Sequence, residues 1–213
     1  MGEGGNGELE PNNSQGVPGA TPQICTMPPQ SRHRRNYNIV GHAHELTFCC
    51  YQRYKFLKAE RTCRWLAEAI NDARVELQFD LWAYVFMPDH VHLIIHPRVA
   101  PYDMASIRTA IKKPASKAAL SWLRENEPSW IPRLTRQRGH RTETHFWQSG
   151  GGYDRNIEEG GTLLKMIDYI HMNPVRKGFV ERPEEWNWSS ARQFLGSRQA
   201  ELLVDPIPAD CLS

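Results

Sequence analysis

Short hydrophobic stretches alternate with longer amphipathic ones over most of this chain. The β-branched and aromatic stretch Leu46–Tyr51 predicts a first strand, and apolar residues at helical spacing predict a helix over Arg61–Val75. Two further hydrophobic stretches, Leu81–Met87 and His90–His96, are separated only by a Pro-Asp pair. Because this pair is typical of a tight turn, we predict a β-hairpin there.

The middle of the chain is less regular. A helix is predicted over Met104–Arg124, with a break or kink at Pro114, because proline removes a backbone hydrogen bond. The polar, basic segment Pro128–Thr144 is predicted to be a loop, and a short strand is predicted over His145–Gln148.

A last helix is predicted over Ile157–Met172. At 100° per residue one face carries four apolar side chains that would pack on the sheet, namely Leu163, Leu164, Ile167 and Ile170. Pro174 is expected to end the helix at Asn173. Strands and helices interleave without a run of parallel βαβ units, which favours an α+β fold with an antiparallel sheet covered by helices on one face.

Composition places the chain among soluble globular proteins. Of 213 residues, 40% are hydrophobic and 23% are charged, which suits one domain or two small ones. No apolar stretch approaches the ~20 residues of a membrane span, so no membrane association is expected. The chain starts without a basic region followed by an apolar one, and its five cysteines form no Cys-x-x-Cys pair. We therefore expect a cytoplasmic protein, associated with the nucleoid, without a disulfide framework.

Charge is distributed unevenly along the chain. Residues 1–30 hold six glycines, five prolines and three acids but no lysine or arginine, which predicts a disordered N-terminal tail over 1–36, a domain over 37–196 and a C-terminal tail over 197–213. Nine basic residues and two acidic ones lie between Ser106 and Arg141, leaving that segment near +7. Such a cluster suits a phosphate backbone, but a solvated helix face with a loop explains it equally well.

The predicted hairpin carries a pair of histidines. Because side chains alternate along a strand, His90 and His92 point to one face, and the apolar Val91, Leu93 and Ile95 point to the other. Two imidazoles on one face are the beginning of a divalent metal site, which needs a third ligand from elsewhere. Exposed polar residues on a strand would give the same pattern.

The last helix ends with a phenol and a carboxamide four residues apart. Tyr169 and Asn173 therefore lie on the same side of the helix. They suit a nucleophile beside a metal or phosphate contact, although a tyrosine at a helix edge followed by Asn-Pro is also an ordinary helix end. Periodicity alone favours the ordinary helix end.

Four motifs together resemble the HUH single-tyrosine transposases, in particular the REP-associated tyrosine transposases. They are YVFMPDHVHLI (Tyr84–Ile94), FWQ (Phe146–Gln148), YIHMNPVRKGFV (Tyr169–Val180) and WNWSS (Trp186–Ser190). The resemblance extends over about Tyr37–Leu195. It implies the ferredoxin-like antiparallel sheet of the HUH nuclease fold and a transposase that cleaves and transfers single-stranded DNA.

The resemblance also implies roles for individual residues. Tyr169 matches the family's nucleophile, which forms a 5′-phosphotyrosine and releases a 3′-hydroxyl. His90 and His92 match its metal-binding histidines, and Asn173 stands at the position of the third protein ligand. The expected ion is Mg²⁺ or Mn²⁺, which would polarise the scissile phosphate. Tyr153 is a rival nucleophile by residue type, but it lacks an amide four residues later, and we interpret it as structural or DNA-contacting.

The expected partner is single-stranded DNA with hairpin-forming repeats; monomer and homodimer remain open. Seven basic residues are candidate DNA contacts: Arg108, Lys112, Lys113, Lys117, Arg155, Arg176 and Lys177. Gly150–Gly152 is richer in glycine than the family's usual segment and predicts distortion of the neighbouring strand. The alternative function is a non-cleaving, domesticated DNA-binding protein of the same fold, and a third hypothesis is a histidine–metal hydrolase of small phosphoesters.

Overall fold

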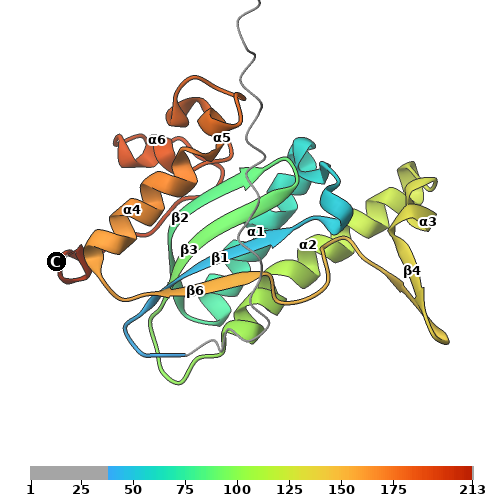
Figure 1. Cartoon of the computed structure of the whole chain (residues 1–213), viewed down its shortest axis with the longest axis horizontal. Helices are drawn as coiled ribbons and strands as arrows, with labels where there is room; N and C mark the ends of the chain where they lie inside the picture. Colours follow the sequence, from blue (N-terminus) through green and yellow to red (C-terminus); the bar gives the residue numbers. More distant parts are fainter. Residues whose placement is uncertain (1–37, 213) are drawn as a thin grey trace, which may run out of the picture. The chain divides into compact units, whose positions relative to one another are not determined.

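The structure, a computed structural model, describes residues 38–212. Four strands form one antiparallel sheet in the order β2-β3-β1-β6 (Figure 1). They are β1 (Ala43–Cys49), β2 (Phe79–Met87), β3 (His90–Pro97) and β6 (Tyr153–Ile157). Helix α1 (Glu60–Glu76) connects β1 to β2, and α2 (Met104–Asn126) follows β3. This order of elements and strands is the ferredoxin-like arrangement, and the predicted α+β fold with an antiparallel sheet and the predicted β-hairpin are confirmed.

Helices α1 and α2 contact each other and cover one face of the sheet. In Figure 1 they lie behind the strands. The apolar side of β3, formed by Val91, Leu93 and Ile95, is fully buried in this layer, as strand alternation predicts. Phe48 of β1 joins the same core.

Helix α4 (Gly160–His171) packs on the opposite face and runs along β2 (Figure 1). The expectation of helices on one face needs correcting here. Strands β2 and β3 carry apolar residues on both sides, so Trp82 and Ile94 need a second covering layer. Leu163, Ile167 and Ile170 of α4 supply it, whereas Leu164 is 45% exposed and does not belong to the buried stripe.

Helix α2 runs without interruption through Pro114, so the predicted break is wrong. The proline lies on the exposed side of the helix. Buried residues on both sides of it, among them Ile111 and Ala115, hold the two halves against the core. Packing of this apolar stripe outweighs the backbone hydrogen bond that proline removes.

The segment predicted as a loop over residues 128–144 contains three short elements. They are α3 (Trp130–Leu134), β4 (Thr135–Arg138) and β5 (Arg141–Thr144). The β4–β5 hairpin pairs only with itself and projects away from the main sheet (Figure 1). Its strands are polar on both sides, so no apolar alternation marks them in the sequence. The strand predicted over residues 145–148 is reduced to a single bridge between Trp147 and Cys50.

After α4 the chain forms α5 (Asn173–Arg176) and α6 (Ala191–Phe194) and returns along the outer edge of β2. Pro174 thus separates two helices and occupies the first turn of α5, where proline is tolerated. The WNWSS motif forms backbone hydrogen bonds with β2, in which Phe86 N donates to Trp188 O and Ser190 N donates to Tyr84 O. Short 3₁₀ turns complete the described chain at Tyr51–Arg53, Phe56–Lys58, Pro183–Glu185 and Ala209–Leu212.

The segment expected as a C-terminal tail is anchored on the domain within the described residues. Leu202 is fully buried in the core, and the Asp205 carboxylate accepts a hydrogen bond from Leu81 N at 2.9 Å. The predicted N-terminal tail over 1–36 lies outside the described residues. No helix between residues 38 and 212 is both long and apolar enough to cross a membrane.

Candidate active site

The two histidines of the hairpin lie on the sheet face that α4 covers. His90 and His92 alternate with Val91, so they share their side of β3 with Ile94, which packs in the α4 layer. The two imidazole centroids are 5.0 Å apart. The strand therefore places a pair of nitrogen donors side by side, as the sequence predicts.

Both imidazole rings are oriented through their Nδ1 atoms. His90 Nδ1 is 2.7 Å from Asp89 Oδ1, and His92 Nδ1 is 3.0 Å from Thr47 Oγ1. Glu45 Oε1 lies 3.9 Å from the same nitrogen of His92. Because the described hydrogen bonds of both rings use Nδ1, the Nε2 atoms are left for another ligand, which is how outer partners prepare metal-binding histidines.

Burial keeps one of these rings uncharged. His92 is 8% exposed, and this burial, reinforced by the neighbouring His90, lowers its pKa from 6.5 to about 3. At neutral pH the His92 imidazole is therefore neutral, and a metal ion would not have to displace a proton from it. The uncharged state of the His92 imidazole therefore fits its use as a ligand of a divalent ion.

Tyr169, Asn173 and Arg176 form a second group at the junction of α4 and α5. The Asn173 amide nitrogen donates to the carbonyl oxygens of Tyr169 and Ile170, at 3.1 and 3.2 Å. Since only the amide NH₂ can donate to carbonyls, Oδ1 must face away from them and can accept or coordinate. The Tyr169 side chain is 41% exposed, and the Arg176 guanidinium lies 4.6 Å from its ring centroid.

The fold brings these two groups to the same face and the same end of the sheet. Helices α4 and α5 both contact β2. Ile170, next to Tyr169, belongs to the apolar cluster that contains Met87, and Met87 is the cross-strand partner of His90. Within residues 38–212 no hydrogen bond, ion pair or ring contact joins Tyr169 or Asn173 to the two histidines. The assignments of nucleophile and metal ligands therefore stay predictions.

The seven basic residues predicted to contact DNA lie in different parts of the structure. Arg108, Lys112 and Lys113 line one cleft beside α2, and Lys117, one turn later, does not. The others are exposed. Arg155 lies on the α4 side of β6, with Nη1 3.8 Å from Met166 Sδ. Arg176 and Lys177 follow Tyr169 at the end of α5.

Residues on β1 complete the surroundings of the histidines, and sequence analysis missed them. Glu45 and Thr47 are buried polar residues that point toward the α4 face. The predicted strand begins only at Leu46, whereas β1 begins at Ala43. Glu45 therefore lies outside the predicted strand, and strand alternation could not assign it to a face of the sheet. Tyr153 on β6 is the cross-strand partner of Thr47, and Thr47 is the cross-strand partner of His92. This rival tyrosine therefore lies on the same face of the sheet as His92, two strands away.

His171, between Tyr169 and Asn173, is buried and gives a testable pH effect. Its Nε2 is 2.7 Å from Ser190 Oγ in the WNWSS motif, and burial lowers its pKa from 6.5 to about 4. The unfolded chain takes up this proton near pH 6.5 and the folded chain only near pH 4. Stability should therefore be lost as pH falls between these values, by up to about 3 kcal/mol from this group.

The measurement is urea unfolding between pH 7.5 and 4 for the parent chain and for His171→Gln. The parent should lose more free energy of unfolding over this range than the variant, because glutamine takes up no proton. Identical pH profiles would contradict a buried, neutral His171.

The comparisons with known proteins agree with this architecture. Residues 38–173 match the family model described as "Transposase IS200 like". A candidate REP-associated tyrosine transposase of Haemophilus influenzae is 28% identical over 138 residues, covering 62% of this chain and 73% of the relative. A REP-associated tyrosine transposase of Escherichia coli is 26% identical over 125 residues, covering 59% of this chain and 62% of the relative.

A solved structure of another protein shares this fold. It is a REP-associated tyrosine transposase bound to a REP hairpin, with a TM-score of 0.61 and 21% identity. The match covers 85% of this chain and 96% of the other. The family model spans more than half of the sequence, including both histidines, Tyr169 and Asn173. The chain therefore belongs to the IS200-like transposase family, a family of DNA-processing enzymes.

Proposed function

We propose that this chain cleaves and rejoins single-stranded DNA through a covalent phosphotyrosine at Tyr169, with a divalent metal held nearby. The observation that carries the proposal is that the histidine pair and the tyrosine lie on the same face of the sheet. Two histidines with available Nε2 atoms and a helix ending in an exposed tyrosine lie on the same side of one sheet. Membership of a transposase family supports the reaction class.

The proposed metal ligands are His90 and His92 through Nε2 and Asn173 through Oδ1. Two imidazole nitrogens and one amide oxygen would leave the remaining coordination positions to water and phosphate oxygens, which are the ligands that Mg²⁺ and Mn²⁺ prefer. When bound, such an ion polarises the scissile phosphate and offsets the charge that develops in the transition state. Asp89, Thr47 and Glu45 would act through the histidines by holding their rings in place.

Tyr169 would attack the phosphorus atom of a phosphodiester. A bond forms between its phenolic oxygen and phosphorus while the bond from phosphorus to the 3′ oxygen breaks. The phenolic proton leaves to water, and the departing 3′ oxygen takes up a proton. Because no water enters the product, the phosphodiester bond energy is retained, and the 3′-hydroxyl of another strand can reverse the step. Arg176, against the Tyr169 ring, would hold the phenol in position.

The proposed substrate is a strand that carries a hairpin next to unpaired DNA. A structurally similar transposase is bound to a REP hairpin, which supports this class of ligand. Arg155, Arg176 and Lys177 are exposed on the face or helix end that carries the candidate site, where they can contact phosphates.

The test is incubation of the full chain with labelled hairpin-bearing single-stranded DNA and Mn²⁺, followed by a denaturing gel. A covalent protein–DNA adduct that disappears in EDTA is expected. Salt-sensitive binding that persists in EDTA, with no adduct under any condition, would instead support the non-cleaving DNA-binding alternative.

A further inference from the structure

We propose that Arg53 contacts the scissile phosphate and stabilises the negative charge that develops there during cleavage, as a further catalytic residue. This inference rests on the proposed function, because it takes the histidine pair as the place where DNA is cleaved. Arg53 belongs to the 3₁₀ turn that follows β1, and its side chain is 48% exposed. It is not among the seven basic residues predicted from the sequence to contact DNA.

Arg53 lies beside the histidine pair. The Asp89 carboxylate connects them, with Oδ1 2.7 Å from His90 Nδ1 and Oδ2 3.3 Å from Arg53 Nε. Arg53 Nη1 also donates to Cys49 Sγ at 2.9 Å, and Cys49 is the cross-strand partner of His90. Because side chains alternate along β1, Cys49 faces the same side of the sheet as Thr47, which is the α4 side. The guanidinium group is therefore on the sheet face that carries both imidazoles.

The Arg53 guanidinium keeps charge and donors that a phosphate can use. A thiol is a weak and mostly uncharged acceptor at neutral pH, so the contact with Cys49 leaves the positive charge intact. Asp89 offsets part of this charge, but the same carboxylate also binds the His90 ring. Between residues 38 and 212, no hydrogen bond or ion pair involves Arg53 Nη2. Its two N–H groups can donate to phosphate oxygens, for which the planar guanidinium is well suited.

The backbone that carries Arg53 is in an unusual conformation. Gln52 and Arg53 have φ angles of 50° and 58°, in the left-handed region that residues other than glycine rarely adopt. Two such residues in succession persist only where neighbouring contacts impose the conformation, and this kind of strain concentrates at functional sites. Glycine would adopt the same φ without strain. An arginine at this position therefore indicates a role for its side chain.

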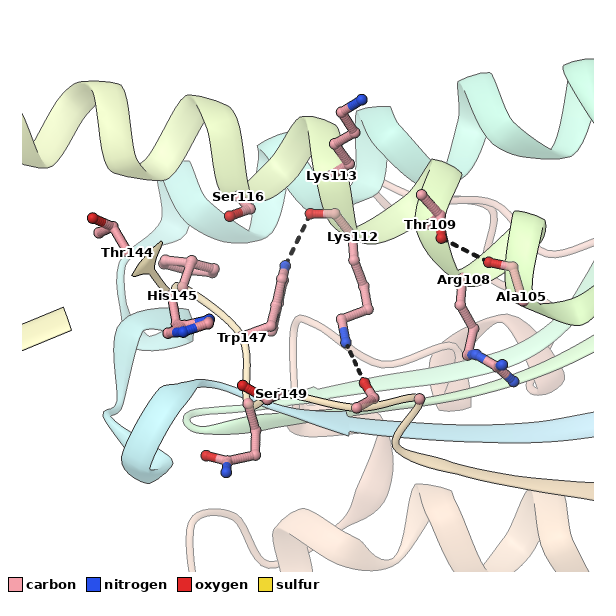
Figure 2. Close-up of a pocket in the computed structure, with 14 residues that line it drawn as sticks. Ala105, Arg108, Thr109, Lys112, Lys113, Ser116, Thr144, His145, Trp147 and Ser149 are labelled. Atoms are coloured by element: carbon pink, nitrogen blue, oxygen red, sulfur yellow. Dashed lines mark hydrogen bonds between the residues drawn. The ribbon is translucent and has the colours of Figure 1, made fainter. Parts of the chain in front are cut away.

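The FWQ motif, which the mechanism does not otherwise use, supplies the contacts that impose this turn. Tyr51 N donates to Phe146 O at 2.8 Å, and Gln52 N donates to the side-chain oxygen of Gln148 at 3.3 Å. The motif is itself fixed to α2, because the Trp147 indole N–H donates to a backbone oxygen of that helix at 3.0 Å (Figure 2). The turn is thus held from both sides, and the guanidinium is positioned before DNA binds.

The first experiment measures the rate of adduct formation in a single turnover, with saturating Mn²⁺ and hairpin-bearing single-stranded DNA. A donor placed in advance on the non-bridging oxygens stabilises the charge of the transition state, so Arg53→Gln should slow adduct formation about 100-fold. Arg53→Gly removes the same side chain and relaxes φ. It should be equally slow and should melt no lower than Arg53→Gln. Adduct formation at the parental rate in either folded variant would overturn the inference.

Arg98→Gln is the matched control. Arg98 is 51% exposed and lies 3.6 Å from the Asp80 carboxylate, but it follows the opposite end of β3. Its substitution should leave the rate within about twofold of the parent. Calorimetric titration with Mn²⁺ separates a phosphate contact from a purely structural role. Loss of a nearby positive charge should leave Mn²⁺ affinity unchanged or increase it. Weaker Mn²⁺ binding in Arg53→Gln would mean that Arg53 only holds Asp89 and His90 in place, and would overturn the contact.

The second experiment tests the contact without cleavage. In EDTA, the affinity for the same DNA is measured at several salt concentrations, and each phosphate contact to a single strand contributes about 0.7 to the slope of log affinity against log salt. Arg53→Gln should lower this slope by about 0.7, and Arg98→Gln should not change it. An unchanged slope in Arg53→Gln would overturn the inference.

The two proposals fail in different ways. A lower slope in Arg53→Gln, with no adduct from the parent chain, would reject the cleavage proposal and leave the phosphate contact standing. An adduct that is lost in Tyr169→Phe but forms at the parental rate in Arg53→Gln would reject the role of Arg53 and leave the cleavage proposal standing.

Discussion

Tyr169→Phe is expected to abolish the covalent DNA adduct, with a loss on the order of 10³-fold or more, because phenylalanine has no oxygen to attack phosphorus. The variant keeps the aromatic ring against Arg176, and the position is 41% exposed. Its stability should therefore stay within about 0.5 kcal/mol of the parent. The measurement is adduct yield on a denaturing gel, alongside a thermal melt.

Tyr153→Phe is the matched control for this experiment. Tyr153 lies in the same row as Thr47 and His92, so position alone makes it the strongest rival. Its substitution should leave the adduct intact. An adduct that survives Tyr169→Phe and is lost in Tyr153→Phe would move the nucleophile from α4 to β6 and refute the proposed mechanism.

His90→Gln is expected to weaken Mn²⁺ binding by at least about 10–100-fold and to suppress adduct formation in parallel. The ring is held through Nδ1 by Asp89, and its Nε2 is the predicted donor to the metal. Glutamine offers no imidazole nitrogen at that place. Calorimetric titration with Mn²⁺ measures the affinity directly, without relying on activity.

His96→Gln provides the comparison on the same strand. His96 stacks on Trp82, with ring centroids 4.5 Å apart, and we interpret it as structural. It should keep the parental affinity for Mn²⁺. Equal weakening by both variants, or Mn²⁺ binding unchanged in His90→Gln, would contradict the assigned metal ligands.

Strong apolar periodicity made much of the fold predictable from the sequence. The β2–β3 hairpin and α1 are close to their predicted ranges because alternation and helical spacing there follow burial directly. The β4–β5 hairpin could not be predicted in the same way, since its polar strands have no buried side. Helix α2 differs from its prediction for another reason. Long-range packing keeps the helix continuous across Pro114, and such packing cannot be predicted from local helix propensity.

The candidate site was predictable where motifs are contiguous and less so where strands meet. Histidines two residues apart must share a strand face, so His90 and His92 follow from local geometry. Glu45 and Thr47 contact His92 only because β1 pairs with β3, and a register between distant segments cannot be read from one sequence. The cleft beside α2 likewise depends on how residues 144–151 return to the helix.

The return of the chain along β2 has a consequence for solubility. An outer strand normally exposes backbone donors and acceptors that can recruit a strand from another molecule. Here Phe86, Tyr84 and Leu81 make their outward hydrogen bonds to Trp188, Ser190 and Asp205. The WNWSS motif and the anchored segment that follows it thus occupy the hydrogen-bonding groups of β2 and prevent edge-to-edge aggregation on that side of the sheet.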